Sequence, residues 1–186
     1  MNRPPVRRLD ATRTTHRLPG SVHASLRTVL GRFATGVTVI TTGGEHAHGM
    51  TANAFSSVSL EPPLVMLCIS KGARLHHSIM QSGSFGVSIL AAGQEDVSRH
   101  FADWRRPDGM AQFAHADHRI GTHTGSPLIA GALAWLECEL VDAFAGGDHS
   151  IFVGKVLGCD LDSGSGALSF FAGGYHVVGT TDRKAS

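Results

Sequence analysis

The feature that most restricts the fold of this chain is a series of short β-type runs separated by glycine-rich turns. Residues 36–42 are β-branched almost throughout, residues 64–69 form one continuous apolar run, and further β-type runs cover 85–90, 136–140, 151–157 and 168–171. Double glycines at 43–44, 146–147 and 173–174 provide turns, and helical patterns are limited to 21–34, 74–81 and 94–101. Many short strands with tight turns and few helices predict an antiparallel β-barrel or sandwich.

The composition is typical of a single globular domain. The chain has 186 residues, of which 42% are hydrophobic and 17% charged, and its formal net charge is +1. This balance, without a basic stripe, gives no electrostatic basis for binding nucleic acid. No apolar run is long enough to span a membrane, and the first residues lack the apolar segment of a secretory signal. We expect a flexible N-terminal arm over 1–20, one domain over 21–179 and a short tail over 180–186.

The cysteines and histidines favour neither a disulfide framework nor a metal centre. Cys68, Cys138 and Cys159 lie far apart in strand-like runs and form no CxxC pair, which is typical of buried free thiols in a reducing compartment. We therefore expect a cytoplasmic protein. His46 and His48 would share one face of a strand, but no nearby cysteine or HExxH helix accompanies them. Solvated histidines and no metal site are the prediction.

The segment 49–63 is small, rich in hydroxyl groups and uncharged until Glu61. Such a segment can offer backbone N–H groups and hydroxyls to a ligand that approaches the main chain. It ends at Pro62-Pro63, a pair that cannot continue a central strand. The alternative interpretation is a polar edge strand followed by a turn, and the residues alone do not decide between the two.

Two further segments could contribute to a binding site. Residues 70–74 follow a buried run and precede a helix, so Lys71 and Arg74 could form a phosphate cradle or could simply be solvated cations. His149 lies just past a double-glycine turn, where a histidine is either exposed or available to a ligand. Residues 102–125 lack periodicity and predict a long excursion over the surface. A GxGxxG fingerprint, a Walker loop and a GxSxG elbow are all absent, so a nucleotide would have to bind outside a Rossmann fold.

Taken in order, residues 33–42, 49–63 and 147–149 resemble the short-chain flavin reductases of two-component monooxygenases, the partners of hydroxylases that act on phenols and 4-hydroxyphenylacetate. The resemblance covers roughly residues 22–175. It implies an antiparallel split β-barrel of Greek-key type with a few short flanking helices, which binds FAD or FMN and forms a homodimer. It also implies hydride transfer from NADH or NADPH to the flavin, and release of reduced flavin to a partner flavin-dependent monooxygenase.

The same resemblance assigns the site residues by position. The flavin would meet a set from three segments of the chain: Gly49, Met50, Thr51, Asn53, Ala54, Cys68, Ile69, Ser70, Lys71, Arg74, Leu75, His100 and Phe101. The nicotinamide would meet His149 and a second segment: Leu168, Ser169, Phe170 and Phe171. No catalytic side chain is expected, because hydride passes directly between the two bound rings.

The chain departs from the family pattern in places. Many relatives have serine where this chain has Ala54, so one hydroxyl contact to the flavin would be missing. Ala73 and Leu75 replace hydroxyl residues near the phosphate, which leaves phosphate binding more dependent on Lys71 and Arg74.

Two alternative functions stay open at this stage. One is a flavin- or haem-binding split-barrel protein without reductase activity. The other is an oxidase of the pyridoxamine phosphate type, which normally carries more basic residues around the phosphate than Lys71 and Arg74 supply.

Overall fold

The computed structural model describes residues 26–162, 164 and 166–179. The predicted arm over 1–20, the predicted tail over 180–186 and the start of the predicted helix over 21–34 lie outside these residues. Residues 26–30 are helical, and the chain then turns into the first strand. The strands are β1 (Thr35–Gly36), β2 (Thr38–Thr42), β3 (His48–Ala52), β4 (Phe55–Leu60), β5 (Pro63–Ser70), β6 (Ser84–Ile89), β7 (His118–Ile120), β8 (Pro127–Ile129), β9 (Ala134–Gly146), β10 (His149–Leu161), β11 (Gly166–Phe171) and β12 (Gly174–Gly179). The helices are α2 (Arg74–Ser82) and α3 (Glu95–Ala102), with short 3₁₀ turns η1 (Gly44–His46) and η2 (Gly109–Phe113).

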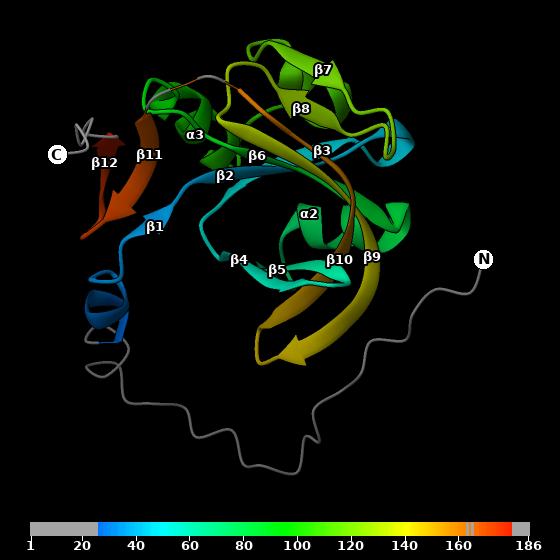
Figure 1. Ribbon diagram of the computed structural model, residues 1–186, viewed down its shortest axis with the longest axis horizontal. Coiled ribbons are helices and arrows are strands. Elements are labelled where there is room, and N and C mark those ends of the chain that lie inside the picture. Colours follow the sequence, from blue (N-terminus) through cyan, green and yellow to red (C-terminus); the bar gives the residue numbers. More distant parts are fainter. Residues whose placement is uncertain (1–25, 163, 165, 180–186) are drawn as a thin grey trace, which may run out of the picture.

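Seven antiparallel strands form one curved sheet in the order β3-β2-β6-β9-β10-β5-β4 (Figure 1). The two edge strands, β3 and β4, are consecutive in the chain and are joined by Asn53 and Ala54, yet they do not pair with each other. The sheet therefore curves round without closing, which is the split barrel that the sequence resemblance implies. A three-stranded sheet, β1-β11-β12, lies beside it, and β7 pairs with β8.

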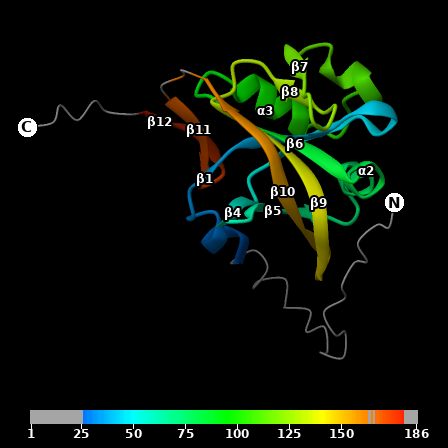
Figure 2. The same cartoon turned by 45° about the vertical axis from the view of Figure 1, so that its right-hand side comes forward.

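The long hairpin of β9 and β10 runs the length of the molecule (Figure 2). Two shifts of register, at Val153/Gly154 and Val156/Gly158, bend it. A Cβ atom at Gly154 would lie 2.4 Å from the ring of Phe85, so the bend depends on glycine at this position. The predicted hairpin turn is confirmed, since Gly147 and Asp148 connect the two strands.

Strand β2 is buried along its whole length although it carries three threonines. The hydroxyls of Thr38, Thr41 and Thr42 donate to the carbonyl oxygens of Ala52, Pro127 and His46, each at 2.6 Å. Buried hydroxyls with such partners avoid the desolvation cost of an unpaired polar group. β-branching thus favours the strand, and side-chain hydrogen bonds allow it to lie in the core.

Alternate residues of β2 enter two apolar cores on opposite faces of the sheet. Ile40 belongs to the core inside the barrel, and Val39 to the core outside it. Helix α2 contributes Leu75 and Ile79 to the inner core and contacts β2, β3, β5 and β6, so it links both halves of the sheet. The outer core includes residues of α3 and η2 that pack behind β2 and β3: Phe101 and Phe113.

Several local expectations need correction. Most of the segment 49–63 forms the edge strands β3 and β4, with a non-strand junction of only two residues, and Pro63 begins β5 opposite Leu60. Residues 102–125 include the turn η2 and strand β7, so they are more than a surface excursion. Glu137 alternates with apolar residues along β9 as a solvent-facing residue would, but it is only 6% exposed, because its carboxylate accepts hydrogen bonds from the 122–124 loop.

The thiols are all free, but only Cys138 is buried, whereas Cys68 is half-buried and Cys159 exposed. Among the described residues, no helix has the length and apolar character needed to cross a membrane.

Candidate functional site

A wide apolar groove lies where the barrel is split. Its volume is about 860 Å³, which is within the range of small-molecule sites. One wall comes from the N-terminal segment and the other from the junction 53–54, β4 and β5. We call it the apolar groove, and it is lined by Leu26, Arg27, Leu30, Gly31, Phe33, Thr35, Asn53, Ala54, Phe55, Ser56, Met66, Cys68 and Phe170.

The groove brings together four of the residues assigned by resemblance: Asn53, Ala54, Cys68 and Phe170. The junction residues Asn53 and Ala54 enter it because β3 and β4 leave the sheet there. Burial raises the pKa of the Cys68 thiol, so this side chain is uncharged at neutral pH. The Oγ1 atom of Thr35 is buried without a hydrogen-bond partner among the described residues. A ligand with a polar edge could satisfy this hydroxyl.

The hairpin turn lies beside the end of β5. His149 is opposite Ser70 in the register of β10 and β5, and the N–H of Lys71 donates to the carbonyl oxygen of Asp148 at 2.9 Å. The Lys71 ammonium donates to the carbonyl oxygen of Gly147. The predicted flavin segment 68–71 and the predicted nicotinamide residue His149 are therefore neighbours, although their sequence separation is large.

His149 has a fixed partner in the turn. Its Nδ1 atom lies 2.8 Å from Oδ1 of Asp148. The hydrogen bond from His149, together with its charge when protonated, lowers the pKa of the Asp148 carboxyl. A carboxylate only accepts hydrogen bonds, so Nδ1 carries the proton and Nε2 of a neutral ring is left as an acceptor.

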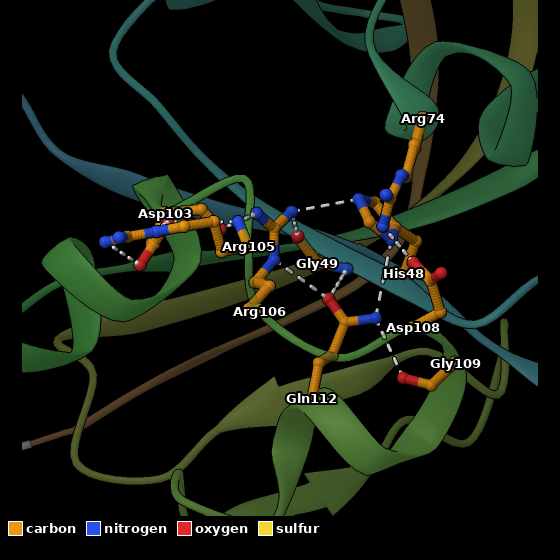
Figure 3. A network of polar contacts seen from close by, with 9 residues as sticks. All are labelled: His48, Gly49, Arg74, Asp103, Arg105, Arg106, Asp108, Gly109 and Gln112. Carbon is orange, nitrogen blue, oxygen red and sulfur yellow. Dashed lines mark hydrogen bonds and ion pairs between the residues drawn. The ribbon is translucent and has the colours of Figure 1, made fainter.

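A second, cationic pocket of about 250 Å³ lies at the N-terminus of α2. Figure 3 shows the polar network on its floor. We call it the cationic pocket, and it is lined by His48, Met50, Gly72, Ala73, Arg74, Ala102, Trp104 and Arg106. Two guanidinium groups beside a helix N-terminus favour an anion such as phosphate.

Arg106 holds the floor of this pocket together (Figure 3). It donates to the carbonyl oxygens of Gly49 and Asp103, to Oε1 of Gln112 and to Nε2 of His48, at 2.9 Å for the last contact. Burial and the neighbouring Arg106 lower the pKa of His48 to about 4, so its ring is neutral and accepts this hydrogen bond. Burial and the charge of Arg74 also lower the pKa of Arg106.

Some of the residues predicted to bind flavin form hydrogen bonds within the protein instead. The N–H of Gly49 donates to Oε1 of Gln112 at 2.8 Å, and the hydroxyl of Thr51 donates to the carbonyl oxygen of Ser98 at 2.7 Å. Nε2 of His100 lies 2.7 Å from the carbonyl oxygen of Gln112.

Other predicted residues have buried side chains. In the flavin set these are Ile69, Leu75 and Phe101, and in the nicotinamide set Leu168 and Ser169, whereas Phe171 is half-buried.

Sequence reasoning missed the residues that complete the cationic pocket. The sequence alone assigns none of Trp104, Arg106 and Asp108 to a binding site. All three lie in the aperiodic segment after α3. His48 was considered only as a partner of His46, but the two do not share a strand, since His46 lies in η1 and His48 begins β3.

Comparisons with known proteins show the family and the fold of this chain. Residues 30–179 match the family described as flavin reductase like domain. An NADH-dependent FAD reductase of Streptomyces globisporus is 53% identical over 132 residues, which cover 71% of this chain and 72% of that protein. The reductase component of 4-hydroxyphenylacetate 3-monooxygenase from Thermus thermophilus is 42% identical over 152 residues, or 81% of this chain and 93% of that protein.

A solved structure is similar over nearly the whole domain. The crystal structure of BorF, the flavin reductase component of a bacterial two-component tryptophan halogenase, has a TM-score of 0.82 and 45% identity, and covers 86% of this chain and 99% of that chain. The chain belongs to the flavin reductase-like domain family, and the predicted family and split-barrel fold are confirmed.

Proposed function

We propose that this protein is an NADH-dependent flavin reductase that supplies reduced FAD or FMN to a separate flavin-dependent monooxygenase. The observation that carries this proposal is the pairing of a wide apolar groove at the split of the barrel with a cationic pocket at the start of α2. FAD and FMN combine the two matching groups, because each has a flat, largely apolar ring system and a negatively charged phosphate. The similarity to reductases whose names specify NADH and FAD supports the choice of both substrates.

The residues of the groove fit an isoalloxazine ring. The lining is largely apolar and uncharged, the junction Asn53-Ala54 exposes main chain, and the unpartnered hydroxyl of Thr35 can meet a polar ring edge. The phosphate end fits Arg74 and the backbone N–H groups that open α2. Lys71 contributes charge nearby but is held by the hairpin turn.

When bound, the flavin would supply the acceptor for a hydride from the reduced nicotinamide ring. The task of the chain is to hold the two rings stacked, at about 3–3.5 Å. No side chain has to exchange a proton in that step, so the absence of a catalytic residue from the assignment is consistent with the chemistry. His149 orients the nicotinamide through Nε2, because Asp148 occupies Nδ1. Phe170, which lines the apolar groove, offers an apolar surface to the same ring system.

The groove also suits a ligand that must leave. Its contacts are apolar and uncharged, and such contacts release a ligand more readily than a cage of charge-assisted hydrogen bonds. FAD mixed with the protein should therefore separate from it on gel filtration. Stoichiometric flavin that stays with the protein through the column would contradict a reductase with a diffusible product.

We also propose that the protein acts as a homodimer. The helical segment 26–30 and the turn after it expose four large apolar side chains: Leu26 (44%), Val29 (62%), Leu30 (62%) and Phe33 (76%). All except Val29 line the groove. Exposed apolar patches of this kind mark interaction surfaces. A second copy of the chain would cover them and enclose the groove.

The activity is tested by steady-state oxidation of NADH and of NADPH, each with added FAD or FMN. We expect flavin-dependent oxidation of NADH by catalytic amounts of the protein. A protein that binds flavin but does not accelerate this oxidation would instead be a split-barrel carrier or sensor. Binding of pyridoxal phosphate in place of flavin would point to the oxidase alternative.

A further inference from the structure

The carboxylate of Asp108 forms an ion pair with the guanidinium of Arg74 (Figure 3). Asp108 stands at the N-cap of η2, where an aspartate normally accepts a hydrogen bond from its own helix. It makes no such cap here. Its side chain instead crosses to α2, to a residue 34 positions earlier in the chain. Both side chains are mainly exposed, 72% for Asp108 and 56% for Arg74, so a ligand can reach the pair.

Arg74 is the cation of this pocket that is available to a ligand. Arg106 is already committed to four acceptors that fix β3 and the loop after α3. His48 is neutral at physiological pH. Among the described residues, Asp108 is the only hydrogen-bond partner of the Arg74 guanidinium.

We propose that Asp108 occupies the place of the flavin phosphate on Arg74, so that a phosphate-bearing flavin binds by displacing this carboxylate. This inference rests on the proposed function. Asp108 then opposes binding in two ways, because its ion pair with Arg74 must be broken and its negative charge lies close to the incoming phosphate. It favours product release for the same reason, since Arg74 regains a partner as reduced flavin leaves. Asp108 is thus a residue that sets the affinity for FAD and FMN without touching the flavin ring.

Flavins with and without phosphate should respond differently to a change at Asp108. FAD and FMN carry phosphate and compete with Asp108, whereas riboflavin has the same ring and no phosphate. A change at Asp108 should therefore alter the affinity for FAD and FMN and leave the affinity for riboflavin as it was. A general disturbance of the groove would alter all three.

The test uses the full chain with Asp108→Asn, and the dissociation constants of FAD, FMN and riboflavin are measured by fluorescence titration. An exposed ion pair contributes up to about 1 kcal/mol, so we expect about 2- to 5-fold tighter binding of FAD and FMN. Asp160→Asn is the matched control, because Asp160 forms a comparable exposed pair with Arg119 at 3.1 Å and lies outside the pocket. In an Arg74→Gln background, Asp108→Asn should no longer tighten binding. Release of reduced FMN, followed by its transfer to an excess of apo-flavodoxin, should be slower in Asp108→Asn than in the unaltered protein.

Three results would overturn the inference: unchanged or weaker binding of FAD in Asp108→Asn, an equal change for riboflavin, or the same tightening in the Arg74→Gln background. Weaker binding would mean that Asp108 positions Arg74 for the phosphate. These failures leave the proposed function intact as long as the unaltered protein binds and reduces FAD. An unaltered protein that binds none of the three flavins would overturn the proposed function itself.

Discussion

The ring of Phe101 packs directly behind the α-carbon of Gly49. A Cβ atom at position 49 would lie 2.7 Å from Cε1 of Phe101 and 3.1 Å from Cζ of Phe113. Strand β3 can therefore approach α3 this closely only with glycine at this position. The neighbours of Gly49 in the strand, His48 and Met50, line the cationic pocket. The close packing of Gly49 thus fixes one wall of the proposed phosphate site.

Replacing Gly49 with alanine should destabilise the protein and weaken flavin binding together. Overpacking of this kind costs about 1–3 kcal/mol and should lower Tm by several degrees, as measured by thermal denaturation. Gly93→Ala is the matched control, because a Cβ atom there meets nothing within 4 Å. A Gly49→Ala protein with unchanged Tm and FAD affinity would contradict the tight contact.

Glu137 should make stability depend on pH in the acid range. Burial would raise the pKa of its carboxyl, but hydrogen bonds from Thr124 and His123 outweigh burial and hold the pKa below its ordinary value. A lowered folded-state pKa stabilises the protein above the unfolded-state value of about 4.3, and this contribution is lost as pH falls through the folded-state pKa.

Glu137→Gln should therefore be less stable than the unaltered protein at neutral pH, by about 1–3 kcal/mol, and the difference should shrink below about pH 4. Urea denaturation at a series of pH values measures this. Glu139→Gln is the control on the same strand, since Glu139 is exposed. A constant difference between Glu137→Gln and the unaltered protein at every pH would argue against the role of the charge.

His149→Ala should impair the use of NADH and leave flavin binding nearly unchanged. One hydrogen bond to the nicotinamide is worth about 0.5–1.5 kcal/mol, so we expect KM for NADH to rise, or hydride transfer to slow, by about 2- to 10-fold. Asp148→Asn should show a smaller effect in the same direction, because it frees the ring from its fixed tautomer. Steady-state kinetics identical to those of the unaltered protein would remove His149 from the site.

Phe33→Ser should weaken self-association. Removing a large aromatic side chain from the centre of an interface typically weakens binding about tenfold or more, and sedimentation velocity measures the change. Leu161→Ser is the control, since Leu161 is 81% exposed and does not line the groove. An unaltered protein that sediments as a monomer at micromolar concentration would contradict the proposed dimer.

The strands could be predicted because their signals are local. The β-branched run 36–42 contains β2, the apolar run 64–69 lies within β5, and the helical spacing at 74–81 marks α2 almost to the residue. Gly147 and Asp148 formed the expected hairpin turn, and this placed His149 at the start of a strand next to Ser70.

Only part of the cationic pocket could be predicted. The cradle at residues 70–74 includes Arg74, but the contribution of Arg106 was missed because this residue lies in an aperiodic segment. Arg106 and His48 are 58 positions apart, and nothing near either residue indicates the other. The family resemblance assigns Phe101 to the flavin by its position in the sequence. A position alone does not indicate that the side chain is buried in the outer core, where the structure places it. Glu137 alternated like a solvent-facing residue, and its partners are backbone N–H groups of a loop that composition cannot locate.

Hydride transfer from NADH to flavin is tested most directly by anaerobic stopped-flow mixing of the protein, FAD and NADH, with the absorbance of oxidised flavin as the signal. We predict that the absorbance is lost at a rate that rises with protein concentration, far exceeds the rate without protein and falls in His149→Ala. Flavin that is bound by the protein, yet reduced no faster than free flavin with NADH, would contradict it.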